Sequence, residues 1–168
     1  MSHRPTQRPA VSLTTLAEKK ALGEPIVMVT AYDFPSAQVA EEAGVDVVLV
    51  GDSGAMTVLG HPSTVPVTTE ELLMLSRAVR RGLKTPLMVC DLPFGSYEAS
   101  NEEAIRNAQR FVKEAGCDAV KVERGGTTVE RARARSTEVP PRSIFTASQP
   151  ASLMKRCALW IASSFDAS

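Results

Sequence analysis

A nine-residue pattern occurs twice in the chain and constrains the fold more than any other feature. Residues 42–50 read Glu-Ala-Gly-Val-Asp-Val-Val-Leu-Val, and residues 114–122 read Glu-Ala-Gly-Cys-Asp-Ala-Val-Lys-Val. In both copies a helix end turns through a glycine into a short, apolar and largely β-branched run, which is typical of a buried parallel strand. The chain is therefore expected to use one helix-strand unit more than once.

Alternating strands and helices are predicted around these two copies. Short apolar runs predict four strands, at residues 26–32, 45–51, 86–90 and 118–122. Helical patterns precede or follow them at residues 12–22, 36–43, 69–81 and 101–115, and a glycine comes directly after each. Capping boxes are expected at two helix starts, Thr68 with Glu71 and Ser100 with Glu103.

The spacing of the predicted strands is compatible with two α/β architectures. Their starts lie about 31 residues apart on average, which matches a (β/α)8 barrel of about 250 residues divided by eight. A doubly wound sheet spaces its strands similarly. Residues 31–35 read Ala-Tyr-Asp-Phe-Pro after the first strand, where a dinucleotide-binding fold would have GxGxxG. We therefore expect the (β/α)8 barrel family, here about the first four βα units plus an N-terminal helix, with the barrel incomplete.

Composition excludes several classes of partner. Nineteen basic and 19 acidic residues give a formal net charge of zero, so neither a nucleic acid nor a membrane surface is an expected partner. The chain has no apolar stretch long enough to span a membrane and no secretory h-region near its start. Three cysteines without a CxxC motif form neither a disulfide framework nor a zinc site. These features predict a cytoplasmic protein.

Polar residues gather where the predicted strands end. Asp52 and Ser53 follow the second strand, Asp91 follows the third, and Lys121 and Glu123 end the fourth. The carboxyl ends of parallel strands converge on one crevice in both architectures. Buried carboxylates are costly unless they are paired or bind a cation, and oxygen ligands without His or Cys favour a hard ion. The pattern therefore predicts a Mg2+ site.

Simpler interpretations stand beside this one. A single Asp at a strand end is more often a helix N-cap or a loop hydrogen-bonding residue than a ligand. Lys121 and Glu123 are as compatible with a structural ion pair as with a catalytic arrangement. Cys90 and Cys117 are expected to be small core residues, and His61 a loop residue.

Five segments together carry a resemblance to a known family. They are Val-Thr-Ala-Tyr-Asp at 29–33, Val-Gly-Asp-Ser at 50–53 with Met56 and Val-Leu-Gly at 58–60, Ser-Thr-Val-Pro-Val-Thr at 63–68, Asp-Leu-Pro-Phe-Gly-Ser-Tyr at 91–97, and Ala-Val-Lys-Val-Glu at 119–123. In this order and spacing they resemble the ketopantoate hydroxymethyltransferase (3-methyl-2-oxobutanoate hydroxymethyltransferase) family. The resemblance covers residues 12–134, the first half of that family's (β/α)8 barrel. One departure is Gly54-Ala55, where many members have Leu-Gly.

The resemblance implies an activity and a set of roles. The activity is hydroxymethyl transfer from 5,10-methylenetetrahydrofolate to 3-methyl-2-oxobutanoate, which gives 2-dehydropantoate for pantothenate and coenzyme A synthesis through a Mg2+-stabilised enolate. The resemblance assigns Mg2+ to Asp52 and Asp91, with Glu123 as a further carboxylate, directly or through water. It assigns the keto acid to Asp52, Ser53, Asp91 and Lys121, and Lys121 adds positive charge where negative charge develops. Members of the family form homo-oligomers.

The last part of the sequence departs from the family. All ten glycines lie at or before residue 126, and nothing after residue 134 resembles the second half of the barrel, where members carry their general-base glutamate. We therefore expect a flexible N-terminus (1–11), a partial barrel (12–134) and a tail (135–168) foreign to the fold, disordered or produced by a shifted reading frame. Weak or no turnover is expected from this chain alone. The alternative is a non-catalytic half-barrel that self-associates or caps a partner.

Overall fold

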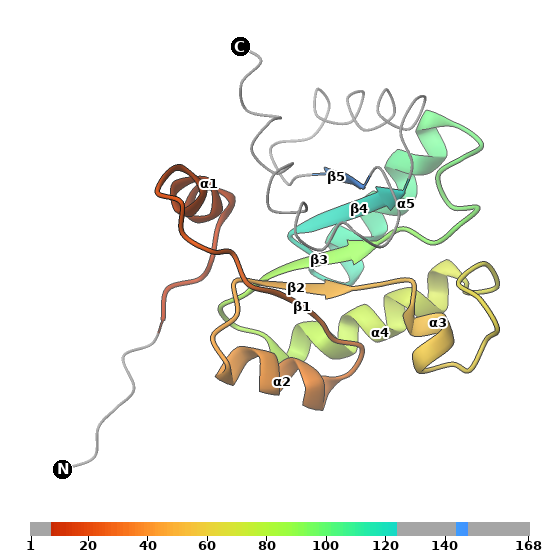
Figure 1. Ribbon diagram of the computed structural model, residues 1–168. Helices are drawn as coiled ribbons and strands as arrows, with labels where there is room; N and C mark the ends of the chain where they lie inside the picture. The colour runs from red at the N-terminus through yellow and green to blue at the C-terminus, as the bar shows by residue number, and fades with distance from the viewer. Residues whose placement is uncertain (1–7, 124–143, 148–168) are drawn as a thin grey trace.

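The structure is a computed structural model that describes residues 8–123 and 144–147 of the chain (Figure 1). Strands and helices alternate through most of this part of the chain, as the repeated unit predicts. In chain order the elements are α1 (Leu13–Ala21), β1 (Met28–Thr30), α2 (Phe34–Glu42), β2 (Val47–Val50), α3 (Gly54–Thr57), α4 (Thr69–Gly82), β3 (Leu87–Asp91), α5 (Asn101–Glu114), β4 (Ala119–Glu123) and β5 (Ile144–Ala147). The sequence analysis missed the short α3, and it extended β1 by two residues at each end.

The sheet decides between the two architectures that strand spacing left open. All of its strands are parallel, and their order across the sheet is β1-β2-β3-β4-β5, the same as their order in the chain. A doubly wound sheet reverses direction at a switch point, whereas a barrel adds every new strand on the same side. The fold is therefore an incomplete (β/α) barrel, as predicted.

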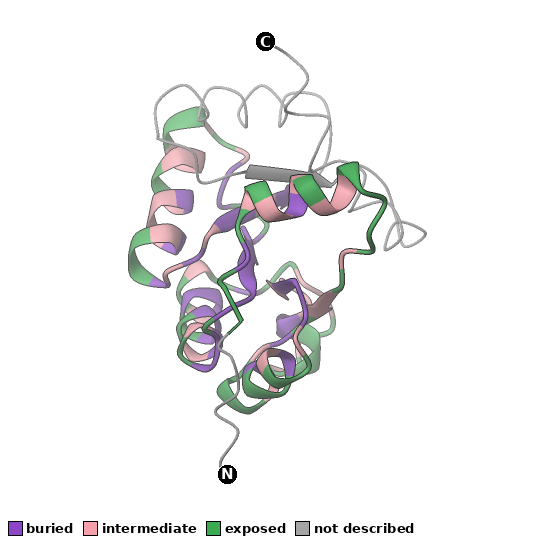
Figure 2. Cartoon of the chain, turned by 90° about the vertical axis from the view of Figure 1, so that its left-hand side faces the viewer, coloured by how far each residue is buried: buried purple, intermediate pink, exposed green. Residues whose placement is uncertain are grey.

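Alternate residues of each strand form two separate cores. One face of the sheet packs against α2, α4 and α5, with Val48, Val50, Met88, Cys90, Val120 and Val122 in contact with Ala37, Leu72, Val79 and Phe111. The buried faces of these helices turn toward the sheet and their exposed faces turn outward (Figure 2). The opposite face carries Val47, Leu87, Val89 and Ala119, and it packs against Val11 and Leu16 of the N-terminal segment. Asp91 and Lys121 alternate onto this second face, which is the inner face of a barrel.

The two copies of the sequence repeat make the same backbone contacts. Gly44 and Gly116 both adopt left-handed φ values, 68° and 71°, as the predicted glycine stops require. The aspartate two residues later accepts a hydrogen bond from the neighbouring strand in each copy. Asp46 Oδ2 accepts from Val27 N at 2.9 Å, and Asp118 Oδ2 accepts from Met88 N at 2.9 Å. The repeated aspartate therefore joins each new strand to the one before it.

Two of the predicted helix-end motifs differ in the structure. Gly82 is the last residue of α4 and not a left-handed residue after it. A side chain would not fit there, because a Cβ at Gly82 would lie 2.7 Å from Ala37 Cβ. Close packing of α4 on α2, and not capping, explains this glycine. The Thr68–Glu71 capping box is confirmed. At Ser100 only half of the predicted box forms, since Ser100 Oγ accepts from Glu103 N without a return bond.

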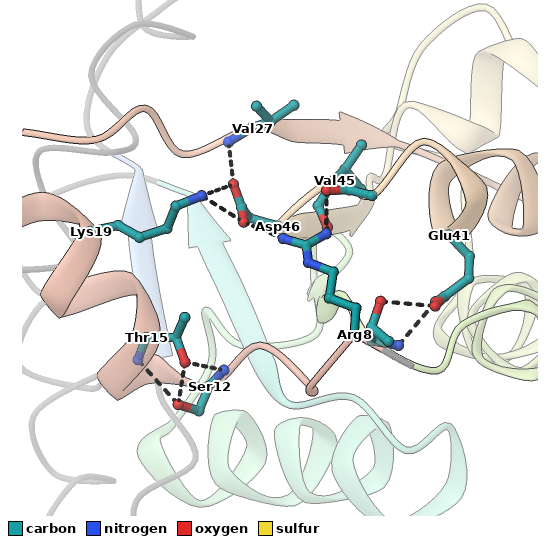
Figure 3. A network of polar contacts seen from close by, with 10 residues as sticks. Arg8, Ser12, Thr15, Lys19, Val27, Glu41, Val45 and Asp46 are labelled. Atoms are coloured by element: carbon teal, nitrogen blue, oxygen red, sulfur yellow. Dashed lines mark hydrogen bonds and ion pairs between the residues drawn. The ribbon is translucent and has the colours of Figure 1, made fainter. Parts of the chain in front are cut away.

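Residues 8–11 differ from the flexible N-terminus that the sequence analysis placed at residues 1–11. Arg8 pairs with Asp46 at 2.8 Å, and Val11 is buried while its N–H donates to Thr85 O. Lys19 of α1 reaches both carboxylate oxygens of Asp46 at 2.8 Å (Figure 3). The partial barrel therefore includes residues 8–11, and Asp46 anchors this N-terminal segment at the amino ends of the strands.

The predicted tail (135–168) contains one described element. The residues of β5 pair in parallel with β4, from Val120 with Ile144 to Glu123 with Ala147. The rest of this tail, together with residues 1–7 and 124–134, lies outside the described residues, so the expectation of a disordered or frame-shifted segment there stays a prediction. Among the helices that the structure describes, none is both long and apolar enough to cross a membrane.

Candidate active site

Strand register brings the predicted site residues together. Asp91 ends β3 and Lys121 lies in β4, and the two are paired Cα partners in the parallel register. Because side chains alternate along a strand, both project from the same face as Val89 and Ala119. The ion pair that results is short, with 2.5 Å between Lys121 Nζ and Asp91 Oδ1.

Asp91 is a buried carboxylate with an unusual proton affinity. Its residue is only 3% exposed, and Asp52 N donates to Oδ2 at 3.1 Å. Burial raises the pKa of Asp91 to about 6, since the Lys121 ammonium and this N–H offset only part of the cost of desolvation. The negative charge of Asp52 contributes to this rise in the pKa of Asp91. Two carboxylates from neighbouring strand ends therefore stand close enough to repel each other.

Lys121 connects the buried carboxylate to a more exposed one. Its Nζ also lies 2.7 Å from Glu123 Oε1, and the side chain of Glu123 is half exposed. Burial by itself would lower the pKa of Lys121, but the carboxylates of Asp91 and Glu123 raise it above its ordinary value. The ion pair that the sequence analysis weighed against a catalytic role is thus present. Lys121 stays charged, which both interpretations require.

Ser53 lies beside the carboxylates on a turn after β2. Its Oγ is 2.8 Å from the phenol oxygen of Tyr32, which follows β1. A Cβ at Gly51 would lie 2.7 Å from Ser53 Oγ and 3.6 Å from Asp91 Oδ2. The serine hydroxyl therefore packs directly on Gly51 and lies near the Asp91 carboxylate, an approach that a side chain at Gly51 would block.

The structure thus groups most of the predicted site. Asp52, Ser53, Asp91 and Lys121 meet at the carboxyl ends of β2, β3 and β4, and Glu123 joins them through Lys121. Within the described ranges, 8–123 and 144–147, no three His, Cys, Asp or Glu side chains are grouped as metal ligands. A metal ion at this place would need oxygen ligands from substrate or water beside Asp52 and Asp91.

The remaining polar and sulfur candidates have structural roles. Asp33 is the N-cap of α2, where its carboxylate accepts from Ser36 N at 2.8 Å. Cys90 and Cys117 are both fully buried, as expected of core residues. His61 lies in the loop after α3.

Two tyrosines contact the site, and the sequence analysis gave neither a role. Tyr32 holds Ser53, and the phenol oxygen of Tyr97 accepts from Glu123 N at 3.2 Å. Tyr32 is the last residue of the first predicted strand, and a polar residue at a strand end was a usable signal. Tyr97 lies six residues beyond β3, and only the path of the intervening loop brings it back to β4.

Comparison with known proteins adds the decisive observation. The family model described as ketopantoate hydroxymethyltransferase matches residues 10–140. The chain belongs to the ketopantoate hydroxymethyltransferase family. The resemblance drawn from the sequence motifs is thereby confirmed, and every residue of the site described above lies within the matched range.

Relatives in this family are similar over most of the described chain. A 3-methyl-2-oxobutanoate hydroxymethyltransferase of Geobacillus kaustophilus is 55% identical over 117 residues, which are 70% of this chain and 42% of the relative. The mitochondrial 3-methyl-2-oxobutanoate hydroxymethyltransferase 1 of Arabidopsis thaliana is 52% identical over 74% of this chain and 35% of its own length. The chain therefore spans less than half of these two ketopantoate hydroxymethyltransferases.

Solved structures agree on the fold. The crystal structure of 2,3-dimethylmalate lyase, a PEP mutase/isocitrate lyase superfamily member, matches with a TM-score of 0.64. The match covers 95% of this chain and 62% of the lyase, at 17% sequence identity. This likeness supports the barrel architecture of the ketopantoate hydroxymethyltransferase chain and says nothing of its substrate.

Proposed function

We propose that this chain carries the keto-acid-binding part of a ketopantoate hydroxymethyltransferase. The reaction would move a hydroxymethyl group from 5,10-methylenetetrahydrofolate to 3-methyl-2-oxobutanoate and give 2-dehydropantoate. The observation that carries the proposal is the buried Asp91 carboxylate, held between Asp52 N and Lys121 Nζ at the strand ends. In a chain 55% identical to a named member, those residues are available for the same task.

Two carboxylates of the site could together bind one divalent metal ion. Asp52 and Asp91 offer carboxylate oxygens from adjacent strand ends, and burial of Asp91, with repulsion by Asp52 added, raises the pKa of Asp91. A hard cation such as Mg2+ relieves that repulsion. Glu123 has one oxygen on Lys121, so we propose that it reaches the ion through water. When bound, Mg2+ would supply a Lewis acid that polarises the keto group of the substrate.

The residues of the chain would hold the substrate and stabilise charge. The Ser53 hydroxyl would donate a hydrogen bond to an oxygen of the keto acid. Lys121 would place its ammonium where the substrate oxygen gains negative charge as the C3 proton leaves. Fixed positions for these groups lower the barrier, because they need no reorganisation during the reaction.

Binding and proton exchange test this proposal. We expect titration calorimetry with 3-methyl-2-oxobutanoate to show binding to the 168-residue chain in Mg2+ and much weaker binding in EDTA. Asp91→Asn is expected to abolish the Mg2+-dependent part. Glu70→Gln, on an exposed ion pair with Arg110, is the matched control and should bind as the unchanged chain does. Absence of Mg2+-dependent binding in the unchanged chain would contradict the proposal.

The second measurement concerns chemistry. We expect slow deuterium uptake at C3 of the keto acid in D2O, followed by proton NMR, and weak or no complete turnover with 5,10-methylenetetrahydrofolate. A positioned general base contributes typically 10²–10⁴-fold, and the family resemblance places that glutamate in the second half of the barrel. Turnover at the rate of a complete family member would contradict the expectation of weak activity.

A non-catalytic half-barrel remains the second candidate, and the edge of the sheet favours it. Within the described residues β1 pairs only with β2, and an unpaired strand edge is a template for association. Self-association without Mg2+-dependent keto-acid binding, measured by sedimentation velocity and calorimetry on one preparation, would support this candidate. A homo-oligomer that binds the keto acid would support the transferase.

A further inference from the structure

The contact between Tyr32 and Ser53 links two neighbouring strand ends inside the candidate site. Tyr32 comes from the turn after β1 and Ser53 from the turn after β2, and their hydroxyl oxygens lie 2.8 Å apart. The tyrosine ring packs against Gly54, since a Cβ at Gly54 would lie 3.0 Å from Tyr32 Cδ1 and 3.3 Å from Tyr32 Cε1. The ring is thus held in place by a residue that has no side chain.

Ser53 Oγ also lies close to the carboxylate of Asp91. The position of a Cβ on Gly51 lies 2.7 Å from Ser53 Oγ and 3.6 Å from Asp91 Oδ2. Ser53 Oγ therefore lies between the Tyr32 phenol oxygen and the backbone of Gly51, close to the carboxylate of Asp91. A ligand bound at the ion pair of Asp91 and Lys121 would come near the serine hydroxyl.

Each hydroxyl has one proton to donate, so the direction of the bond matters. If the Tyr32 phenol donates its hydrogen bond to Ser53 Oγ, the serine proton is free to point toward a ligand bound beside Asp91 and Lys121. Hydrogen bonds in series strengthen one another, and a donor to an anionic oxygen gains more than a donor to a neutral one. The arrangement then favours a ligand with a negatively charged oxygen at Ser53.

We propose that Tyr32 is a positioning residue that donates to Ser53 Oγ and turns the serine proton toward the carboxylate of the keto acid. It thereby sets the preference of the site for an acid over a neutral analogue. This inference rests on the proposed function, which supplies the keto acid. Beyond that function, it assigns to Tyr32 the preference for a negatively charged ligand over a neutral one.

The test compares two ligands on two single variants. Calorimetry in Mg2+ measures 3-methyl-2-oxobutanoate and its neutral amide, 3-methyl-2-oxobutanamide. Tyr32→Phe keeps the ring over Gly54 and removes the hydroxyl, and we expect it to weaken acid binding about tenfold with little effect on the amide. Thr57→Val is the matched control, because the Thr57 hydroxyl donates to Ser53 O and not to Oγ. It should leave both affinities unchanged.

A double variant separates positioning from a structural role. If Tyr32 acts through Ser53, then Tyr32→Phe should cause no further loss of acid binding in a Ser53→Ala background. Equal weakening of acid and amide by Tyr32→Phe, or an additive loss in the double variant, would overturn the inference.

The unchanged chain distinguishes the two proposals. If it binds the acid and Tyr32→Phe binds it equally well, the role of Tyr32 is refuted and the proposed function stands. If the unchanged chain does not bind the acid, both are refuted.

Discussion

Nζ of Lys121 lies 2.5 Å from Oδ1 of Asp91, and the two residues are Cα partners across β3 and β4. Strand register therefore sets the charge balance of the site. A slip of one residue would move Lys121 to the opposite face of the sheet, among the apolar contacts of Val120 and Val122 with the helices. Asp91 would then have no cation to offset its burial.

Lys121→Met is expected to destabilise the chain by about 3 kcal/mol at pH 7, because it leaves a buried carboxylate without its partner. The pKa of Asp91, about 6 in the folded chain, is above its ordinary value near 4. Protonation is therefore favoured by folding, and the loss should be largest above pH 6 and smallest near pH 4. Urea unfolding at both pH values measures this. Lys113→Met on the exposed face of α5 is the control, and an equal loss at pH 4 and pH 7 would contradict the prediction.

Asp46→Asn is expected to lower the unfolding free energy by about 2 to 3 kcal/mol, since the Asp46 carboxylate is buried and bonded to Arg8, Lys19 and Val27 N. Burial opposes ionisation, but these partners hold the pKa of Asp46 below its ordinary value. Its stabilisation is thus present above about pH 4 and is lost as the pH falls further.

The second copy of the repeat provides the matched control for Asp46. Asp118 occupies the equivalent position, but its side chain is 40% exposed, and its carboxylate forms an ion pair with Arg80 and accepts from Met88 N. Asp118→Asn should cost less than about 1 kcal/mol in the same urea titration. Equal losses at the two positions would show that the contacts of Asp46 to the N-terminal segment add nothing.

Gly82→Ala is expected to destabilise the chain by about 2 kcal/mol despite the better helix propensity of alanine. The added Cβ would meet Ala37 Cβ at 2.7 Å and Phe34 O at 2.9 Å, and backbone cannot yield cheaply. Thermal unfolding followed by circular dichroism measures the change. In a double-mutant cycle Ala37→Gly should recover part of the loss; a purely additive double variant would contradict close packing as the cause.

Gly51→Ala is expected to weaken keto-acid binding about tenfold, because its Cβ would lie 2.7 Å from Ser53 Oγ and force the serine hydroxyl out of its present position. Titration calorimetry in Mg2+ measures the affinity. The same substitution should cause little further loss once Ser53→Ala has removed the hydroxyl. Undiminished binding by Gly51→Ala would show that the ligand does not depend on the present position of Ser53 Oγ.

Local pattern determined much of the fold. Gly44 and Gly116 end helices in the left-handed conformation that glycine adopts at low cost, and the apolar runs after them form buried strands. These are short-range effects, so a single sequence contains them. Gly82 shows where reasoning from neighbouring residues fails. A glycine is needed there because α4 packs against Ala37 of α2, which lies 45 residues earlier in the chain.

The sequence by itself determined the alternation of strands and helices, the family, and the identity of the strand-end residues, because each depends on neighbours along the chain. Only the tertiary structure decided between a barrel and a doubly wound sheet, since that depends on the side on which each strand is added. It also brought Asp91 to Lys121 and Tyr32 to Ser53. Those contacts depend on register and on loop paths, which are set by packing between segments far apart in the chain.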